Sequence, residues 1–376
     1  MRWKKIVMIG PVYPFKGGIS HYTGMMCRVL RKNHDVSMVS FRMQYPKFLF
    51  KKEQKDFSND QFKIEDTKFW LNTANPFNIW KTARKVRKES PELVIIQWWH
   101  PYFAPCDWLL CRLLGKSKIL FVCHNVFPHE RFPFDRWLTK RVLRRGDYFL
   151  VHSQLDEKNL KEICPNAFVQ RVVLPTFQAF RMQGISKESA RKALHIGETE
   201  HILLFFGFVR PYKGLKYLLQ AMPEIVNQVE GTRLFVVGDF GGDKGDYERL
   251  VCEKSLDSCV KIVDGYIPDQ EVELYFSACD LVVLPYESAT QSGIIQIAYG
   301  FQKPVVATRV GGLPEVITEG KTGFLAEPKD PASLAESVIR FFESEDTVNW
   351  KENIRQEEKK YSWERLEEAV EAFYGE

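Results

Sequence analysis

Residues 201–228 read HILLFFGFVRPYKGLKYLLQAMPEIVNQ and contain the pattern from which we infer the fold. An apolar run of strand length, His201–Phe206, is followed by a glycine-marked turn and then by a segment of helical periodicity. The apolar residues of that segment form one stripe, made of Leu215, Leu218, Leu219, Met222, Ile225 and Val226. A buried strand, a turn and an amphipathic helix in this order are typical of a βαβ unit.

The same pattern recurs on both sides of this stretch. Towards the C-terminus we expect further strands at Arg233–Val237, Val260–Val263, Leu281–Leu284 and Val305–Thr308, with helices near 244–256, 268–278 and 292–301. Towards the N-terminus we expect a helix at Ile19–Leu30 and strands at Lys5–Gly10, Leu93–Gln97, Ile119–Cys123 and Tyr148–Val151. Strands that alternate with helices predict an α/β protein with parallel sheets, here as two Rossmann-like domains that face a cleft.

Length and composition agree with two soluble domains. A chain of 376 residues is too long for one ordinary core. We expect an N-terminal domain over 1–180, a second domain over 181–358, and a C-terminal helix over 359–376 that crosses back to the first domain. Residues 43–76 lack clean periodicity, so we interpret them as loops or an insertion.

The expected location is cytoplasmic. No apolar run approaches the ~18 residues that a membrane span needs, and we interpret the first apolar run as a strand rather than a signal peptide. The eight cysteines include no CxxC pair and no Cys/His cluster with zinc spacing, so we expect reduced thiols and no metal site.

Charge is distributed unevenly along the chain. Residues 1–180 hold 31 Lys and Arg against 15 Asp and Glu, a net charge of +16, whereas the remainder carries −11, which together give the overall +5. A basic half favours an anionic partner such as a membrane surface, and the alternative is a solvated surface without a partner. We expect no nucleic-acid partner, because no recognised binding module is present.

Glycine-marked turns are the candidate ligand sites. Gly17-Gly18 opens a helix, Gly207–Gly214 joins a strand to a helix, and Leu284–Gly293 leads into another helix. Backbone amides at a helix start, together with Arg210 and Lys213, suit a diphosphate. Tight turns without any ligand are the alternative. The dinucleotide fingerprint, the P-loop and a paired Asp-x-Asp metal motif are all absent.

In combination these motifs resemble the C-terminal domain of GT-B-fold, family-4 glycosyltransferases. The resemblance covers roughly 200–345 and rests on R-x-x-K-G, K-P-V-V-A-T, V-G-G-L-P-E-V-I and G-x-T-G-F-L. The first half is similar more loosely, through Gly17-Gly18, His124-Asn125 and Ser153. The resemblance implies a retaining transferase without cofactor or metal, which binds a UDP- or GDP-sugar mainly with its second domain and a glycan or lipid-linked acceptor with its first.

The resemblance also implies roles for particular residues. His124, Arg210 and Lys213 are the expected catalytic residues, and His100, Asn125 and His129 the expected acceptor-binding ones. Donor binding is expected from Gly17, Gly18, Arg210, Lys213, Tyr266, Gln291, Ser292, Gly293, Ile294 and Gln296. The family's two glutamates are missing, because their positions fall on Ala289 and Ile297. We expect Gln296 to hydrogen-bond a ribose hydroxyl instead.

A basic amphipathic segment, Phe132–Arg145, adds a membrane hypothesis. We expect Trp137, Lys140, Arg141, Arg144 and Arg145 to contact anionic lipid, as peripheral proteins do at the inner membrane face. The alternative is a helix whose apolar side packs on its own domain. The predicted function is therefore a hexosyltransferase of cell-surface polysaccharide or glycolipid synthesis. The alternatives are a sugar-nucleotide epimerase or hydrolase of the same fold, and an inactive scaffold.

Overall fold

The computed structural model describes residues 3–50, 52–128, 130 and 132–374, and the chain divides into two compact units. Unit 1 contains the residues up to Val173 together with Trp363 onwards, and unit 2 spans Leu174–Ser362. Thr176 belongs to unit 2 because its backbone N–H donates to the carbonyl of Tyr361, and the N–H of Phe177 donates to that of Gln296.

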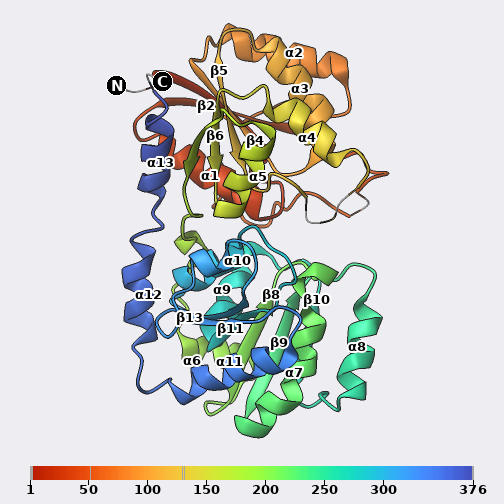
Figure 1. Ribbon diagram of the computed structural model, residues 1–376, viewed down its shortest axis with the longest axis vertical. Coiled ribbons are helices and arrows are strands. Elements are labelled where there is room, and N and C mark those ends of the chain that lie inside the picture. The colour runs from red at the N-terminus through yellow and green to blue at the C-terminus, as the bar shows by residue number, and fades with distance from the viewer. Residues whose placement is uncertain (1–2, 51, 129, 131, 375–376) are drawn as a thin grey trace. The chain divides into compact units, whose positions relative to one another are not determined.

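Unit 1 is built on a parallel seven-stranded sheet of order β3-β2-β1-β4-β5-β6-β7 (Figure 1). Its strands are β1 (Lys5–Ile9), β2 (Asp35–Met43), β3 (Lys68–Asn72), β4 (Leu93–Trp98), β5 (Lys118–Cys123), β6 (Tyr148–Val151) and β7 (Phe168–Arg171). Its helices are α1 (Gly18–Leu30), α2 (Pro76–Lys88), α3 (Ala104–Leu113), α4 (Asp135–Leu143), α5 (Gln154–Ile163) and α13 (Trp363–Glu371), with a short 3₁₀ turn η1 (Pro101–Phe103).

The helices of unit 1 cover the sheet because each has an apolar stripe. Side chains of α2, α3, α4 and α5 join one buried cluster with the strands, through residues such as Val86, Leu110, Val142 and Leu160. Helix α13 packs against α1 (Figure 1), and the indole N–H of Trp3 donates to the carbonyl of Val370 at 3.1 Å. The expected return of the C-terminal helix to the first domain is therefore confirmed.

Unit 2 repeats the architecture on a parallel six-stranded sheet of order β10-β9-β8-β11-β12-β13. Its strands are β8 (His201–Phe206), β9 (Thr232–Gly238), β10 (Val260–Asp264), β11 (Leu281–Leu284), β12 (Val305–Thr308) and β13 (Gly323–Ala326). Its helices are α6 (Lys187–Leu194), α7 (Leu215–Gln228), α8 (Lys244–Glu253), α9 (Asp269–Ala278), α10 (Gly293–Gly300), α11 (Pro331–Glu343) and α12 (Trp350–Glu358), with 3₁₀ turns η2 (Gln178–Phe180), η3 (Pro211–Lys213) and η4 (Leu313–Glu315).

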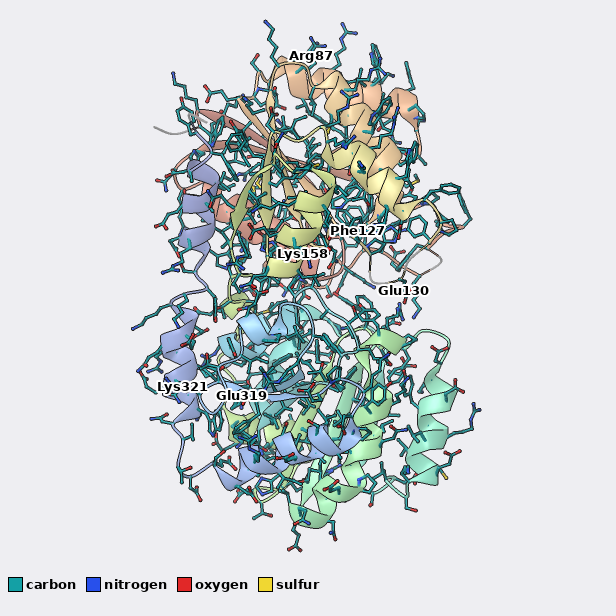
Figure 2. The ribbon with its side chains drawn as sticks, in the orientation of Figure 1. Arg87, Phe127, Glu130, Lys158, Glu319 and Lys321 are labelled. Carbon is teal, nitrogen blue, oxygen red and sulfur yellow. The ribbon has the colours of Figure 1, made fainter. Side chains whose placement is uncertain are left out.

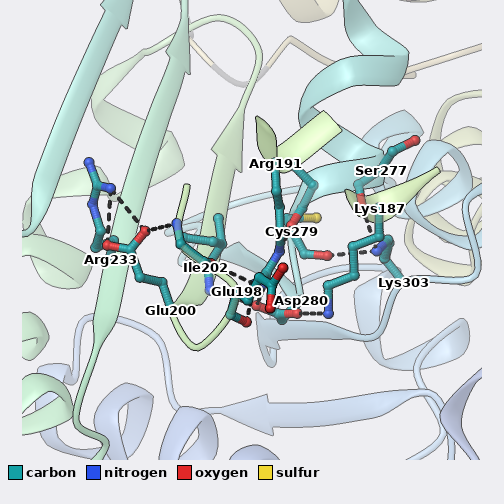
Figure 3. Close-up of polar contacts among 12 residues, drawn as sticks. Lys187, Arg191, Glu198, Glu200, Ile202, Arg233, Ser277, Cys279, Asp280 and Lys303 are labelled. Atoms are coloured by element: carbon teal, nitrogen blue, oxygen red, sulfur yellow. Dashed lines mark hydrogen bonds and ion pairs between the residues drawn. The ribbon is translucent and has the colours of Figure 1, made fainter. Parts of the chain in front are cut away.

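A buried ion-pair network fixes α6 to the sheet of unit 2 (Figure 3). Asp280 lies just before β11, and its carboxylate contacts Lys187 at 2.6 Å and Arg191 at 2.7 Å. The same carboxylate accepts the backbone N–H of Ile202 at 2.7 Å. One buried anion therefore connects α6, β8 and β11.

Two expectations on organisation differ from the structure. Residues 68–72 of the supposed insertion form strand β3, which pairs with β2 through an irregular register. The basic segment expected over 132–145 is helical only at Asp135–Leu143. No helix in the described part of the chain is both long and apolar enough to cross a membrane.

Candidate functional site

Both sheets have a topological switch point, where open α/β sheets bind ligands. In unit 2 the strand order reverses at β8, which lies between β9 and β11. In unit 1 it reverses at β1, between β2 and β4. The candidate sites are therefore the loops after β8 and β11 in unit 2, and the loops after β1 and β4 in unit 1.

The two switch-point loops of unit 2 contact each other closely. The backbone N–H of Glu287, after β11, donates to the carbonyl of Tyr212, after β8, at 2.7 Å. Gly214 has a φ of 66°, and a Cβ there would lie 1.9 Å from the carbonyl oxygen of Pro285. Glycine at this position therefore permits the approach, because any side chain would force the loops apart.

Two cations, Arg210 and Lys213, converge at this junction. Arg210 and Lys213 are half-buried, and neither forms an ion pair with an acidic side chain in the described part of the chain. Burial lowers the pKa of Lys213, and the nearby Arg210 lowers it further. Because an uncompensated buried cation is costly, this arrangement suits an anionic ligand.

The start of α10 adds backbone donors to the same site. A Cβ at Gly293 would meet nothing within 4 Å, and the N-cap residue Ser292 makes no side-chain cap hydrogen bond, so the first amides of α10 are candidate donors to a ligand. Ser292 hydrogen-bonds Tyr286, whose pKa burial raises to about 12. The Cδ1 of Ile294 lies 3.6 Å from the position of a Cβ at Gly207, so α10 adjoins the β8 loop.

The remaining residues expected to bind the donor lie at different places in unit 2. Gln296 is 1% exposed, and its Oε1, like that of Gln291, is buried without a hydrogen-bond partner in the described residues. Tyr266 follows β10, an outer strand, so it lies at the same edge of the sheet but beyond β9. The topology thus brings the β8 and β11 loops together and leaves Tyr266 farther away.

The switch point of unit 1 begins with an open glycine turn. Gly17 has a φ of 102° and directly precedes α1. A Cβ at Gly17 or Gly18 would meet nothing within 4 Å, so the N-terminus of α1 is accessible to a ligand. The donor-binding role expected for the two glycines stays a prediction.

His124 lies directly after β5 and is buried rather than exposed. Its Nε2 is 2.8 Å from Oε1 of Gln97, so the imidazole donates to an amide oxygen that only accepts. Burial holds its pKa well below the usual range, with His152 as a second cause, so the ring is neutral. The ring of Tyr22 packs edge-on against it, with centroids 4.7 Å apart.

Sequence reasoning missed the residues around His124, namely Gln97, Tyr22 and His152. A polar side chain at the end of the apolar run Leu93–Gln97 was the available signal for Gln97. Neither Tyr22 nor His152 has a local signal, because α1 and β6 bring them to β5 from distant parts of the chain.

The expected acceptor residues have different surroundings. His100 begins η1, where its Nδ1 accepts the N–H of Tyr102 at 3.1 Å, and burial lowers its pKa. It also stacks on Phe132, with ring centroids 5.7 Å apart. Asn125 is half-buried next to His124. His129 lies outside the described residues.

On helix α4, the residues that pack on the core and the residues expected to bind the membrane lie on different sides. Val142 and Leu143 join the core, whereas Trp137 is 59% exposed and Phe134, which precedes the helix, is 77% exposed. The amphipathic segment therefore has no single apolar face, because the helix directs Val142 inward and Trp137 outward. Lys140, Arg141, Arg144 and Arg145 are exposed beside Trp137.

Two parallel sheets with flanking helices define an α/β protein of the GT-B fold, and solved structures agree. Sucrose-phosphate synthase from Thermosynechococcus elongatus superposes with a TM-score of 0.74 at 18% identity, covering 99% of this chain and 98% of that one. HepE of Anabaena, solved in complex with UDP-glucose, gives a TM-score of 0.75 at 17% identity and covers 98% of each chain.

The sequence comparisons identify the family. The model for glycosyltransferase family 4 matches residues 16–175, and that for group 1 glycosyl transferases matches residues 200–344. An uncharacterized glycosyltransferase of Methanocaldococcus jannaschii is 30% identical over 99% of this chain and 98% of its own length. The chain therefore belongs to the family-4, or group 1, glycosyltransferases, as its motifs predicted.

Relatives with named activities match over shorter stretches. The lipopolysaccharide 1,2-N-acetylglucosaminetransferase of Salmonella typhimurium is 29% identical over 68% of this chain and 66% of its own length. D-inositol 3-phosphate glycosyltransferase of Corynebacterium efficiens is 26% identical over 50% of this chain. This chain spans about half of the length of the Corynebacterium efficiens relative and about two thirds of that of the Salmonella one.

Proposed function

We propose that this glycosyltransferase moves a sugar from a UDP- or GDP-sugar to a glycan or lipid-linked acceptor, with retention and without a metal ion. The observation that carries the proposal is the pair of cations at the switch point of unit 2, Arg210 and Lys213, which have no acidic partner among the described residues. The UDP-glucose in the HepE structure and the named activity of the Salmonella relative support this class of donor and acceptor.

The chemistry follows from where charge develops. As the bond to the anomeric carbon breaks, negative charge grows on the departing diphosphate, and fixed cations and amides stabilise it. Arg210 offers a bidentate fork, Lys213 a point charge, and the N-terminus of α10 its amides. The acceptor hydroxyl attacks on the face that the diphosphate leaves, and a leaving phosphate oxygen takes its proton, so no protein base is required.

Two further residues complete the donor and sugar contacts. Ala289 and Ile297 replace the glutamate pair, whereas the buried Oε1 of Gln296 remains an acceptor without a partner in the described residues. We propose that it accepts a hydrogen bond from a ribose hydroxyl. The neutral His124, oriented by Gln97, is proposed to contact the transferred sugar.

A nucleotide panel tests the donor site. We expect one of the nucleoside diphosphates, UDP or GDP, to raise the melting temperature equally with and without magnesium. At 100 times its Kd a ligand adds about 2.7 kcal/mol of stability, enough for a shift of a few degrees. The absence of a shift with any nucleotide or nucleotide-sugar would contradict the proposal and favour the inactive scaffold, which the missing glutamates already suggest.

Membrane association is the second part of the proposal, at the inner membrane face. Helices α2, α3 and α4 neighbour one another (Figure 1). Helix α2 carries five Lys and Arg and no acidic residue, and Arg87 projects from its outer side (Figure 2). Trp80 is 42% exposed and lies under the guanidinium of Arg84. The acidic residues of α3 and α4 are Asp107 and Asp135, and both are buried. Exposed aromatic rings among many cations suit anionic headgroups, although Arg136 of α4 already pairs with Glu162 at 3.2 Å.

Charge reversal tests this surface. Replacing Arg144 and Arg145 together by glutamate is expected to release the protein from vesicles that contain anionic phospholipid, because each cation near such a surface contributes about 1 kcal/mol. Co-sedimentation at low and high salt measures the loss. The matched control, Arg233→Glu in unit 2, should leave binding unchanged. If the double variant stays fully bound to the vesicles, α4 does not bind the membrane and has a structural role only.

A further inference from the structure

A three-residue cluster lies at the amino ends of the strands in unit 1, away from the loops considered above. His34 occupies the turn between α1 and β2, and Glu367 and Glu371 are one helical turn apart on α13. Residues at i and i+4 share one face of a helix. One ligand atom from each of the three side chains lies within 4.8 Å of the other two.

The hydrogen bonding of His34 determines which of its nitrogens faces the glutamates. Its Nδ1 is 2.9 Å from the backbone carbonyl oxygen of Trp3, so Nδ1 carries the proton. The other nitrogen, Nε2, is fully buried and has no hydrogen-bond partner in the described residues. It is 3.3 Å from Oε1 of Glu371 and 3.8 Å from Oε1 of Glu367. The ring nitrogen that can act as a metal ligand, Nε2, therefore points at two carboxylates.

Three side chains that each direct one ligand atom at a common point have the geometry to share one cation. Zinc binds imidazole nitrogen and carboxylate oxygen at about 2.0–2.2 Å, which in a tetrahedron places neighbouring ligand atoms about 3.3 Å apart. The observed separations of 3.3 and 3.8 Å approach this value. Imidazole with carboxylates favours zinc-like ions over magnesium or calcium.

The surroundings resemble the outer shell of a metal site. A ligating histidine usually donates its second ring N–H to a carbonyl, as Nδ1 of His34 does to Trp3. Oε1 of Glu367 accepts from the Nδ2 of Asn33 at 2.8 Å, which fixes the orientation of that carboxylate. Glu371 is partly exposed, so solvent can reach the cluster and supply a fourth ligand.

We propose that His34, Glu367 and Glu371 bind one zinc-class divalent cation, with water as the fourth ligand. The ion ties α13 to the α1–β2 turn and so joins the two separate chain segments of unit 1. The site is structural. It is independent of the proposed sugar transfer, because it lies at the opposite edge of the sheet from the switch-point loops.

Metal analysis of the full-length protein tests the site. After removal of metal by a chelator and addition of Zn²⁺, we expect one zinc per chain by elemental analysis and a higher melting temperature, with no effect of Mg²⁺. Glu371→Gln and His34→Asn should each weaken zinc binding by tenfold or more. The control Glu364→Gln should bind normally, since Glu364 is on the same helix but contacts Lys32, at 3.6 Å.

The visible spectrum of the Co²⁺-loaded wild-type protein gives a readout that does not depend on the folding of any variant. We expect bands of a nitrogen- and oxygen-bound tetrahedral ion without thiolate charge transfer. A thiolate band, or zinc that persists in both the His34 and Glu371 variants, would assign the metal to a cysteine such as the exposed Cys252 and overturn the proposal. Wild-type protein that binds no zinc would overturn it as well.

Discussion

Replacing Lys213 by alanine is expected to lower the rate of sugar transfer by about 10²–10³-fold and to weaken nucleotide binding. Lys213 is a half-buried cation without an acidic partner in the described residues, so its charge remains available to a ligand. Removing it takes away one of the fixed positive groups that stabilise the charge of the departing diphosphate. Arg210→Ala should act in the same direction, and Arg210→Lys should restore only part of the loss, because an ammonium cannot form the bidentate fork.

Steady-state kinetics and calorimetry with the preferred nucleotide separate the two effects. Lys244→Ala is the matched control, since Lys244 is a lysine of the same unit that already pairs with Glu248 at 3.3 Å. Its rate and affinity should equal those of the wild type. If both Lys213→Ala and Arg210→Ala keep wild-type rate and affinity, the diphosphate does not bind at this junction.

Asp280→Asn is expected to destabilise unit 2 by about 3–5 kcal/mol. The side chain of Asp280 is 4% exposed and is the anion for Arg191, which is 8% exposed, and for Lys187 (Figure 3). The substitution keeps the size of the side chain but removes the charge, so Arg191 stays buried without a counter-ion. The carbonyls of Ala278, Gly197 and Glu198 still accept from the guanidinium, which places the loss near the lower end of this range.

Urea unfolding followed by circular dichroism measures this loss. Glu200→Gln provides the control, because its pair with Arg233 at 3.1 Å is about a quarter exposed on both sides and should be worth less than about 1 kcal/mol. A loss for Asp280→Asn no larger than that of the control would show that the network does not hold α6 on the sheet.

Local patterns predicted the elements that carry strong periodicity. The strand at His201–Phe206 and the helix after it lie where the sequence pattern predicted them. The same is true of most strands on either side. Strand β3 was missed because Lys68–Asn72 has mixed burial and pairs with β2 through register shifts, so its sequence lacks a clean period. Its strand character depends on a partner distant in the chain.

The part of the candidate site that the strand order determines was predictable from the sequence. Residues after β8 and β11 meet because parallel strands place their carboxyl ends at one edge, and the motifs marked both loops. The surroundings of His124 and the cluster at His34 were not predictable in this way. Each depends on side chains that come together only after folding, such as Gln97 with His124 and Glu371 with His34.

Turnover with a broad set of nucleotide-sugars tests the central claim most directly. The full-length protein is incubated with UDP- and GDP-sugars, with and without glycan and lipid-linked acceptors. Released nucleoside diphosphate is quantified, and the anomeric configuration of the product is determined by NMR. We predict release that requires an acceptor and a product that retains the configuration of the donor. Release without any acceptor would instead indicate an epimerase or hydrolase, and neither binding nor turnover with any nucleotide-sugar would contradict the account.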